Sequence, residues 1–193
     1  MVSVAVIMVA FCIYYSFQIW RRRIDPTLST WIIFLAGTGL SLVTYGLAEN
    51  HDYQSGILNT LDVVSVAIIL SAILKWGKPE LRFRQHEKWY LVGAALIVGY
   101  GIMTGDVWSS NLYTQVLICC GYIPLIQTLV TEKRNTESFF GWICGLSAGI
   151  IGLYPAVVSG NALAVIYAVR TIIAVSVVLF FMVYYQYVKP PPT

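Results

Sequence analysis

The stretch Tyr122–Ser138 reads YIPLIQTLVTEKRNTES, and the rest of the chain is interpreted from it. It begins as an apolar helix that contains Pro124, passes through Gln127 into a basic turn, and ends in a polar segment able to start another helix. Far earlier in the chain, Tyr14–Ser29 (YYSFQIWRRRIDPTLS) follows the same order. The similarity predicts that one structural unit occurs twice.

A single offset aligns the two copies. An internal repeat determines the topology of the whole chain. Three pairs of identical residues, each 109 residues apart, support the repeat: Gln18 with Gln127, Ser29 with Ser138, and Tyr45 with Tyr154.

The composition indicates a membrane protein. Hydrophobic residues make up 58% of the 193 residues and charged residues only 11%, whereas soluble domains carry about 25% charged residues. A chain of this length has room for about six to eight membrane spans. All four cysteines lie inside apolar runs, which argues against a disulfide framework or a zinc site. The net charge of +3 comes from loops between apolar runs and does not indicate a nucleic-acid partner.

Seven apolar segments are expected to form helices. The first is interpreted as a retained helix and not a cleaved signal peptide, because no basic segment precedes it and its arginines follow it. Thr136 is expected to cap the sixth helix. The expected helices cover residues 2–20, 29–48, 55–76, 89–103, 112–130, 137–157 and 161–188.

Basic residues predict the orientation of these helices. Of the 12 Lys and Arg residues, all except Arg170 lie at the ends of helices or in loops that alternate along the chain. The positive-inside rule then places the N-terminus outside and the C-terminus in the cytoplasm. The loops on the other side, at residues 49–55, 104–108 and 158–160, contain no Lys or Arg. Short loops favour a plasma-membrane location.

Seven spans and a repeat of 109 residues divide as three, one and three. The expected fold is an all-α membrane protein with two three-helix bundles, residues 1–76 and 108–193, joined by a linker helix within residues 77–107. Because the linker crosses the membrane once more, the two bundles run parallel and are related by an axis along the membrane normal.

This architecture resembles the SWEET sugar transporters, together with the half-sized SemiSWEETs and the wider PQ-loop superfamily. The resemblance implies a carrier that moves a small polar solute, such as a sugar, an amino acid or an organic acid, by alternating access between the two repeats. It also implies that Asn59 and Asn161 line the substrate pocket; the alternatives are an interhelical hydrogen bond for Asn59 and an N-cap of the last helix for Asn161. The matching motifs are Tyr122-x-Pro124 followed by Lys133 and Thr136-Glu137-Ser138, then Tyr154-Pro155, then Gly160-Asn161.

Asp62 and Arg170 are the only charged residues well inside the expected spans. A charge at mid-span costs about 2.5–3.5 kcal/mol on insertion scales, so such residues face the bundle interior. They lie 108 residues apart, within one residue of the repeat offset. We expect them to approach each other across a central cavity, either as a structural ion pair or as a site for substrate or proton coupling. Such a site favours a zwitterionic or acidic solute.

Repeat-matched polar residues are further candidates. Gln18 and Gln127 lie near the basic loops, where they either line the pathway or bond neighbouring helices. Tyr45 and Tyr154 lie near the other ends of their helices, as an outer gate or as part of the interfacial aromatic belt. Pro124 and Pro155 each free a backbone carbonyl and bend their helices, which makes them candidate hinges.

Nothing in the sequence indicates an enzyme, a cofactor or a metal site. His51 and His86 fall in loops on opposite sides of the membrane, and no hydrolase or phosphate-binding motif is present. The expected partners are the bilayer and a small solute, and a homo-oligomer is left open. The alternative function is a receptor or sensor that does not transport, or a structural membrane subunit, on the same scaffold.

Overall fold

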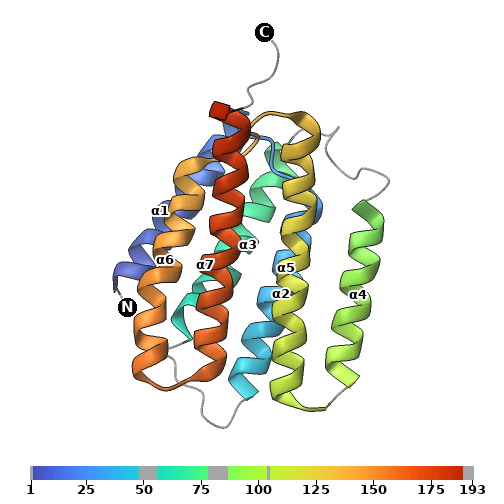
Figure 1. Cartoon of the computed structure of the whole chain (residues 1–193), viewed down its shortest axis with the longest axis vertical. Helices are drawn as coiled ribbons and strands as arrows, with labels where there is room; N and C mark the ends of the chain where they lie inside the picture. Colours follow the sequence, from blue (N-terminus) through green and yellow to red (C-terminus); the bar gives the residue numbers. More distant parts are fainter. Residues whose placement is uncertain (1, 48–55, 78–86, 104, 189–193) are drawn as a thin grey trace.

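The computed structural model describes residues 2–47, 56–77, 87–103 and 105–188. These residues form seven α-helices, and a short π-helical segment, η2, extends the last of them (Figure 1). The elements are α1 (Val2–Trp20), α2 (Leu28–Leu47), α3 (Ile57–Trp76), α4 (Glu87–Met103), α5 (Val107–Glu132), α6 (Phe139–Val158), α7 (Ala162–Val183) and η2 (Tyr184–Val188). The seven expected helices are confirmed, with most ends within two residues of the prediction.

Capping residues explain the largest differences. Helix α5 begins five residues before the predicted start because the Asp106 carboxylate accepts hydrogen bonds from Trp108 N (3.3 Å) and Ser109 N (2.9 Å). The prediction that Thr136 caps α6 is wrong. Ser138 is the N-cap, and its hydroxyl accepts from Gly141 N at 3.3 Å.

Six of the helices, all except α4, are long and apolar enough to cross a membrane. Their outward faces carry exposed aliphatic side chains, as expected for a surface in contact with lipid. These side chains come from every helix and include Val6, Val43, Val64, Leu96, Val116, Ile150 and Ile173. The protein is therefore a multi-pass membrane protein. With 17 residues, α4 is the shortest of the seven helices.

The six long helices pack in a closed ring. Going round it, α1 packs against α3, α3 against α2, α2 against α5, α5 against α7, α7 against α6, and α6 against α1. Helix α4 lies outside this ring and packs on α5 and α2 (Figure 1). Glycines bring α2 and α5 close together, since a Cβ on Gly37 would lie 2.5 Å from Ile118 Cγ1.

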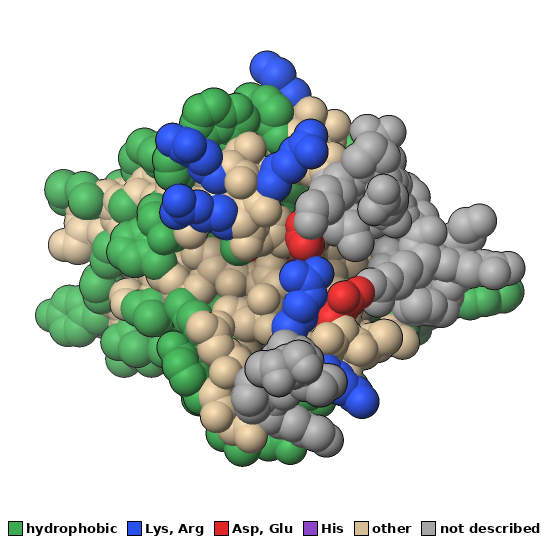
Figure 2. Space-filling model, turned by 90° about the horizontal axis from the view of Figure 1, so that it is seen from above, with side chains coloured by type: hydrophobic (Ala, Val, Ile, Leu, Met, Phe, Trp, Pro, Cys, Tyr) green, Lys and Arg blue, Asp and Glu red, His purple; other side chains and the backbone are tan. Residues whose placement is uncertain are grey.

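Basic side chains gather at one end of the ring, as Figure 2 shows. This end holds the last residues of α1, α3 and α5 and the loops that follow α1 and α5, and we call it the basic end. Each of those loops has a left-handed residue within its first two positions, Arg22 (φ 54°) after α1 and Lys133 (φ 51°) after α5, which ends the helix. The described basic residues here are Arg21, Arg22, Arg23, Lys75, Lys133 and Arg134. The expected loop at residues 78–86 and both histidines lie outside the described residues.

Candidate functional site

A cavity lies on the axis of the six-helix ring. It contains about 550 Å³ of empty space, including its opening, with room for a few water molecules. Side chains from α1, α2, α3, α5, α6 and α7 line it, so every helix of the ring contributes. The lining residues are Met8, Phe11, Trp31, Phe34, Thr38, Leu58, Asp62, Val66, Ile118, Tyr122, Gly141, Trp142, Gly145, Arg170, Thr171 and Val175.

Both charged residues singled out from the sequence, Asp62 and Arg170, line this cavity. The described contacts include no ion pair between them. Tyr167 stands between the two, since its hydroxyl donates to Asp62 Oδ2 (2.6 Å) while the guanidinium of Arg170 lies 4.4 Å from its ring centroid. The cation–π contact and the short hydrogen bond therefore connect the opposite charges through one phenol.

Arg170 is 9% exposed, and not all of its guanidinium N–H groups have a hydrogen-bond partner. Its Nε donates to Gln115 Oε1 at 3.2 Å, but its Nη2 is buried without a hydrogen-bond partner. The Tyr122 phenol is near enough to the guanidinium to interact with it, and among the described residues no group forms a hydrogen bond with Nη2. An unpartnered, buried N–H of a charged group is unfavourable, so this nitrogen marks a place for an acceptor.

A network of amides and hydroxyls closes the ring beside Arg170, toward the end opposite the basic end. Gln115 Nε2 donates to Asn111 Oδ1 (3.1 Å) and to Ser41 Oγ (3.2 Å). Asn111 Nδ2 donates to Thr44 Oγ1 at 2.9 Å. Because these residues come from α2 and α5 and join Arg170 on α7, the network ties three helices together.

Asn59 joins the same network from α3. Both ends of its amide are satisfied when Nδ2 donates to Thr38 O (3.3 Å) and Oδ1 accepts from Leu42 N (3.2 Å) and the Ser41 hydroxyl (3.1 Å). The amide thus bridges one turn of α2. Asn59 was predicted to line the substrate pocket, but it is 5% exposed, is absent from the lining of the central cavity, and makes an interhelical hydrogen bond.

Near the basic end, an aromatic group packs around the carboxyl of Glu137. The Tyr15 hydroxyl and Trp142 Nε1 (3.1 Å) both donate to Glu137 Oε2. The other oxygen, Oε1, is buried without a partner, and so is Trp31 Nε1. The ring centroids of Tyr15 and Trp31 lie 5.2 Å apart. Since Trp31 and Trp142 also line the cavity, this group forms its floor.

Glu137 precedes α6 and lies outside the membrane-spanning helices. Burial, together with a smaller effect of the negative charge of Asp25, raises the pKa of its carboxyl from 4.5 to about 7. The hydrogen bonds from Tyr15 and Trp142 oppose this increase in pKa because they favour the charged form. The carboxyl therefore changes its charge near neutral pH.

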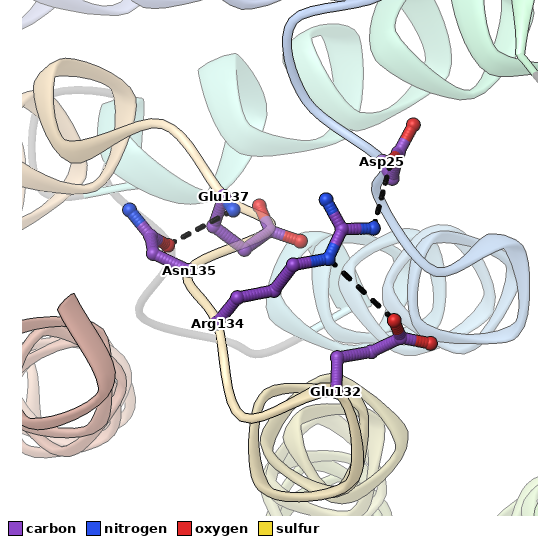
Figure 3. A network of polar contacts seen from close by, with 5 residues as sticks. All are labelled: Asp25, Glu132, Arg134, Asn135 and Glu137. Atoms are coloured by element: carbon purple, nitrogen blue, oxygen red, sulfur yellow. Dashed lines mark hydrogen bonds and ion pairs between the residues drawn. The ribbon is translucent and has the colours of Figure 1, made fainter. Parts of the chain in front are cut away.

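Two loops cover the floor from the basic end. Figure 3 shows Arg134 extended between Asp25 (Nη2–Oδ2, 3.3 Å) and Glu132 (Nε–Oε2, 3.6 Å). The backbone joins the same loops, since Asp25 N donates to Thr136 O at 3.0 Å. In Figure 3 the Asn135 side chain turns toward Glu137 and accepts from its backbone N–H at 3.0 Å.

The other predicted site residues lie away from the cavity. Asn161 caps α7, since its Oδ1 accepts from Ala164 N (3.1 Å), and its Nδ2 donates to the Tyr45 hydroxyl (3.2 Å). Tyr45 is 6% exposed and packs beside a small pocket next to the network, whereas Tyr154 is 74% exposed on the outside of the ring. The repeat-matched tyrosines therefore have different surroundings. The exposed position of Tyr154 is the one expected for a residue of the interfacial aromatic belt.

The paired glutamines also differ in their contacts. Gln127 accepts from the Tyr90 hydroxyl of α4 at 2.9 Å, and the Nε2 of Gln18 donates to the exposed Tyr14 hydroxyl at 2.9 Å. Neither is among the residues that line the cavity. Pro124 lies inside α5 and Pro155 inside α6, as predicted.

Glu137 and Tyr15 were not predicted as site residues from the sequence. Glu137 stands in a polar, basic segment, and nothing in its neighbours signals burial. Tyr15 lies in a mostly apolar helix, and its sequence context does not indicate a polar role. Only the contact between α1 and the start of α6 brings them together. In the described residues, no three acidic, Cys or His side chains are grouped as metal ligands.

No protein-family model, curated protein or solved structure matches this chain.

Proposed function

We propose that this protein is a SWEET-like carrier that moves a small polar solute by alternating access. The observation that carries the proposal is the cavity on the axis of the helical ring, because it contains an acidic and a basic side chain that are not paired directly with each other. Charged residues inside a membrane bundle commonly mark substrate or ion pathways.

The order of helices round the ring supports two parallel three-helix repeats. The first repeat would be α1–α3–α2 and the second α5–α7–α6, with α4 as the linker outside them. Under the offset of 109, the contact of α1 with α6 corresponds to that of α5 with α2, and both contacts are present. A two-fold axis between the repeats accounts for this arrangement.

One ion pair supports the same axis. Asp25 and Arg134 are 109 residues apart, so they occupy equivalent positions of the two repeats, and they contact each other. Two equivalent positions that touch must lie close to the symmetry axis. The axis would then run from the basic end through the cavity, with the basic end in the cytoplasm and the N-terminus outside.

Closure at both ends is consistent with a carrier between its two open states. The amide network around Gln115 and Asn111 closes one end of the axis, and the loops joined by Asp25 and Arg134 close the other. Rocking of one repeat against the other would break one of these sets of contacts while keeping the other. Pro124 in the middle of α5 offers a place for the required bend.

Uptake into proteoliposomes tests the proposal. The panel would include sugars, amino acids and organic acids, each with and without a pH gradient, in a plasma-membrane-like lipid mixture. For the transported solute we expect Asp62→Asn and Arg170→Gln to lower the initial rate at least about tenfold, because each removes one charge from the cavity. Arg21→Gln, an exposed arginine at the basic end, is the matched control and should leave the rate unchanged.

If no solute of the panel is transported by a folded protein, carriage is refuted. Binding of a solute without uptake would then indicate a receptor or sensor. Neither binding nor uptake would indicate a structural subunit.

A further inference from the structure

The polar groups of the cavity are unevenly distributed. Asp62 lies in the second turn of α3 and Arg170 in the third turn of α7, and both helices begin at the end opposite the basic end. The two lining threonines already donate to their own helices, Thr38 to Phe34 O (2.7 Å) and Thr171 to Tyr167 O (2.9 Å). A solute would therefore find its ionic partners at one end of the cavity.

Most of the remaining lining is aromatic or aliphatic. The rings of Phe34 and Tyr122 pack at a tilt with centroids 4.6 Å apart, and the Trp142 ring centroid lies 6.0 Å from that of Tyr122. Such a wall suits an apolar group of the solute. It suits a sugar poorly, because hydroxyls all round a sugar ring would lose their hydrogen bonds to water and find few partners in return.

The unpartnered Nη2 of Arg170 can donate a hydrogen bond to an anionic acceptor. A guanidinium binds a carboxylate with short, charge-assisted hydrogen bonds, and Nε is already held in place by Gln115. The Asp62 carboxylate, which accepts from the Tyr167 hydroxyl, offers a group of opposite charge at the end of the same phenol whose ring Arg170 covers. One acid and one base at the same end of the cavity match one ammonium and one carboxylate on a single small molecule.

We propose that the cavity, which holds only a few water molecules in this closed structure, widens when one repeat rocks away from the other and then binds an α-amino acid with an apolar or aromatic side chain. Its carboxylate lies on Arg170, its ammonium on Asp62, and its side chain among the aromatic residues of the wall. This inference rests on the proposed function, of which it specifies the solute.

The test uses three probes that differ by one charged group. L-Phenylalanine carries both charges, 3-phenylpropionate lacks the ammonium, and 2-phenylethylamine lacks the carboxylate; D-glucose is the neutral comparison. Binding to the purified full-length protein in lipid nanodiscs is measured by equilibrium dialysis with radiolabelled compounds. We expect phenylalanine to bind at least about tenfold more tightly than either analogue, because each analogue leaves one buried charge without its partner.

Two substitutions identify which residue binds the carboxylate of the amino acid and which binds its ammonium group. Arg170→Gln should remove the preference for phenylalanine over 2-phenylethylamine and keep the preference over 3-phenylpropionate. Asp62→Asn should remove the preference for phenylalanine over 3-phenylpropionate and keep the preference over 2-phenylethylamine. Because each result is a ratio within one variant, it separates recognition from a general loss of binding. Arg21→Gln should leave all three affinities unchanged.

Each outcome decides the inference or the proposed function separately. If glucose binds as tightly as phenylalanine, or if the two analogues bind the wild-type protein as tightly as phenylalanine, the inference is overturned. The comparison on the wild-type protein stands even where a variant fails to fold. Uptake of a sugar by the same protein would support a carrier while overturning the amino-acid site. Binding of phenylalanine without uptake would support the site while overturning carriage.

Discussion

Replacing Glu137 with Gln should remove a pH dependence from the stability of this protein. The carboxyl is 4% exposed, it touches Tyr15 and Trp142, and its second oxygen has no partner. Its environment therefore favours the neutral form. Glutamine has nearly the same shape, stays neutral at every pH used, and keeps one oxygen to accept a hydrogen bond.

The magnitude follows from the pKa of this carboxyl, which is about 7 in the folded protein and ordinarily 4.5. Each unit between the two values corresponds to about 1.36 kcal/mol. Because the folded protein holds this proton more tightly than the unfolded chain does, stability is greatest below pH 4.5 and falls as the pH rises to 7. The expected loss across this window is about 3 kcal/mol.

The assay is unfolding of the purified protein in mixed detergent micelles, followed by circular dichroism, at pH 5, 6, 7 and 8. The wild-type protein should lose stability over this series, and Glu137→Gln should lose about 2.5 kcal/mol less between pH 5 and pH 8. At pH 8 the variant should be the more stable of the two. At pH 5 the two should lie within about 1 kcal/mol, since the variant gives up at most one hydrogen bond.

A second substitution tests the direction of the same effect. The Tyr15 hydroxyl lowers the pKa of Glu137 by donating a hydrogen bond to its carboxylate. Tyr15→Phe should therefore raise that pKa above 7, so that stability continues to fall to a higher pH. Identical pH dependence in the wild-type protein and Glu137→Gln would refute the reasoning. It would mean that water or a cation reaches the carboxyl and keeps it charged.

Three further predictions concern packing, capping and bending. Gly37→Ala should destabilise the protein by about 1–3 kcal/mol, because the new methyl group meets Ile118, whereas Gly39→Ala, with open space around it, should not destabilise it; equal unfolding midpoints for the two would contradict this. Ser138→Ala should lower stability by about 1 kcal/mol in the same unfolding assay through loss of the N-cap of α6, and an unchanged midpoint would exclude that role. Pro124→Ala should slow solute exchange in proteoliposomes if bending of α5 drives rocking, and unchanged exchange would argue against Pro124 as a hinge.

The sequence was informative where one residue type acts alone. Length and hydropathy determine the spans, since each backbone in lipid must satisfy its own hydrogen bonds within a helix. Asp62 and Arg170 were recognisable as interior residues because a charge facing lipid is unfavourable. Asn161 is a favoured capping residue in front of an apolar run, and it caps α7 as that pattern suggests.

Contacts between helices decided the rest. Asp62 and Arg170 share a cavity but meet through Tyr167, a tyrosine that resembles twelve others in the sequence. The glutamines matched by the repeat have different partners, since Gln127 bonds to Tyr90 of α4, which packs on α5, whereas Gln18 bonds to Tyr14 within α1. A repeat relates backbones, and it does not oblige equivalent side chains to share an environment.

By itself, the sequence determined that this chain is a multi-helix membrane protein with two charged residues among its apolar spans, because composition and helix length depend on transfer from water to lipid. The tertiary structure alone decided that Glu137 is buried and that its neighbours are Tyr15 and Trp142. Burial of a loop carboxyl depends on which helices approach it, and residues 122 positions apart in the chain carry no local signal of that approach.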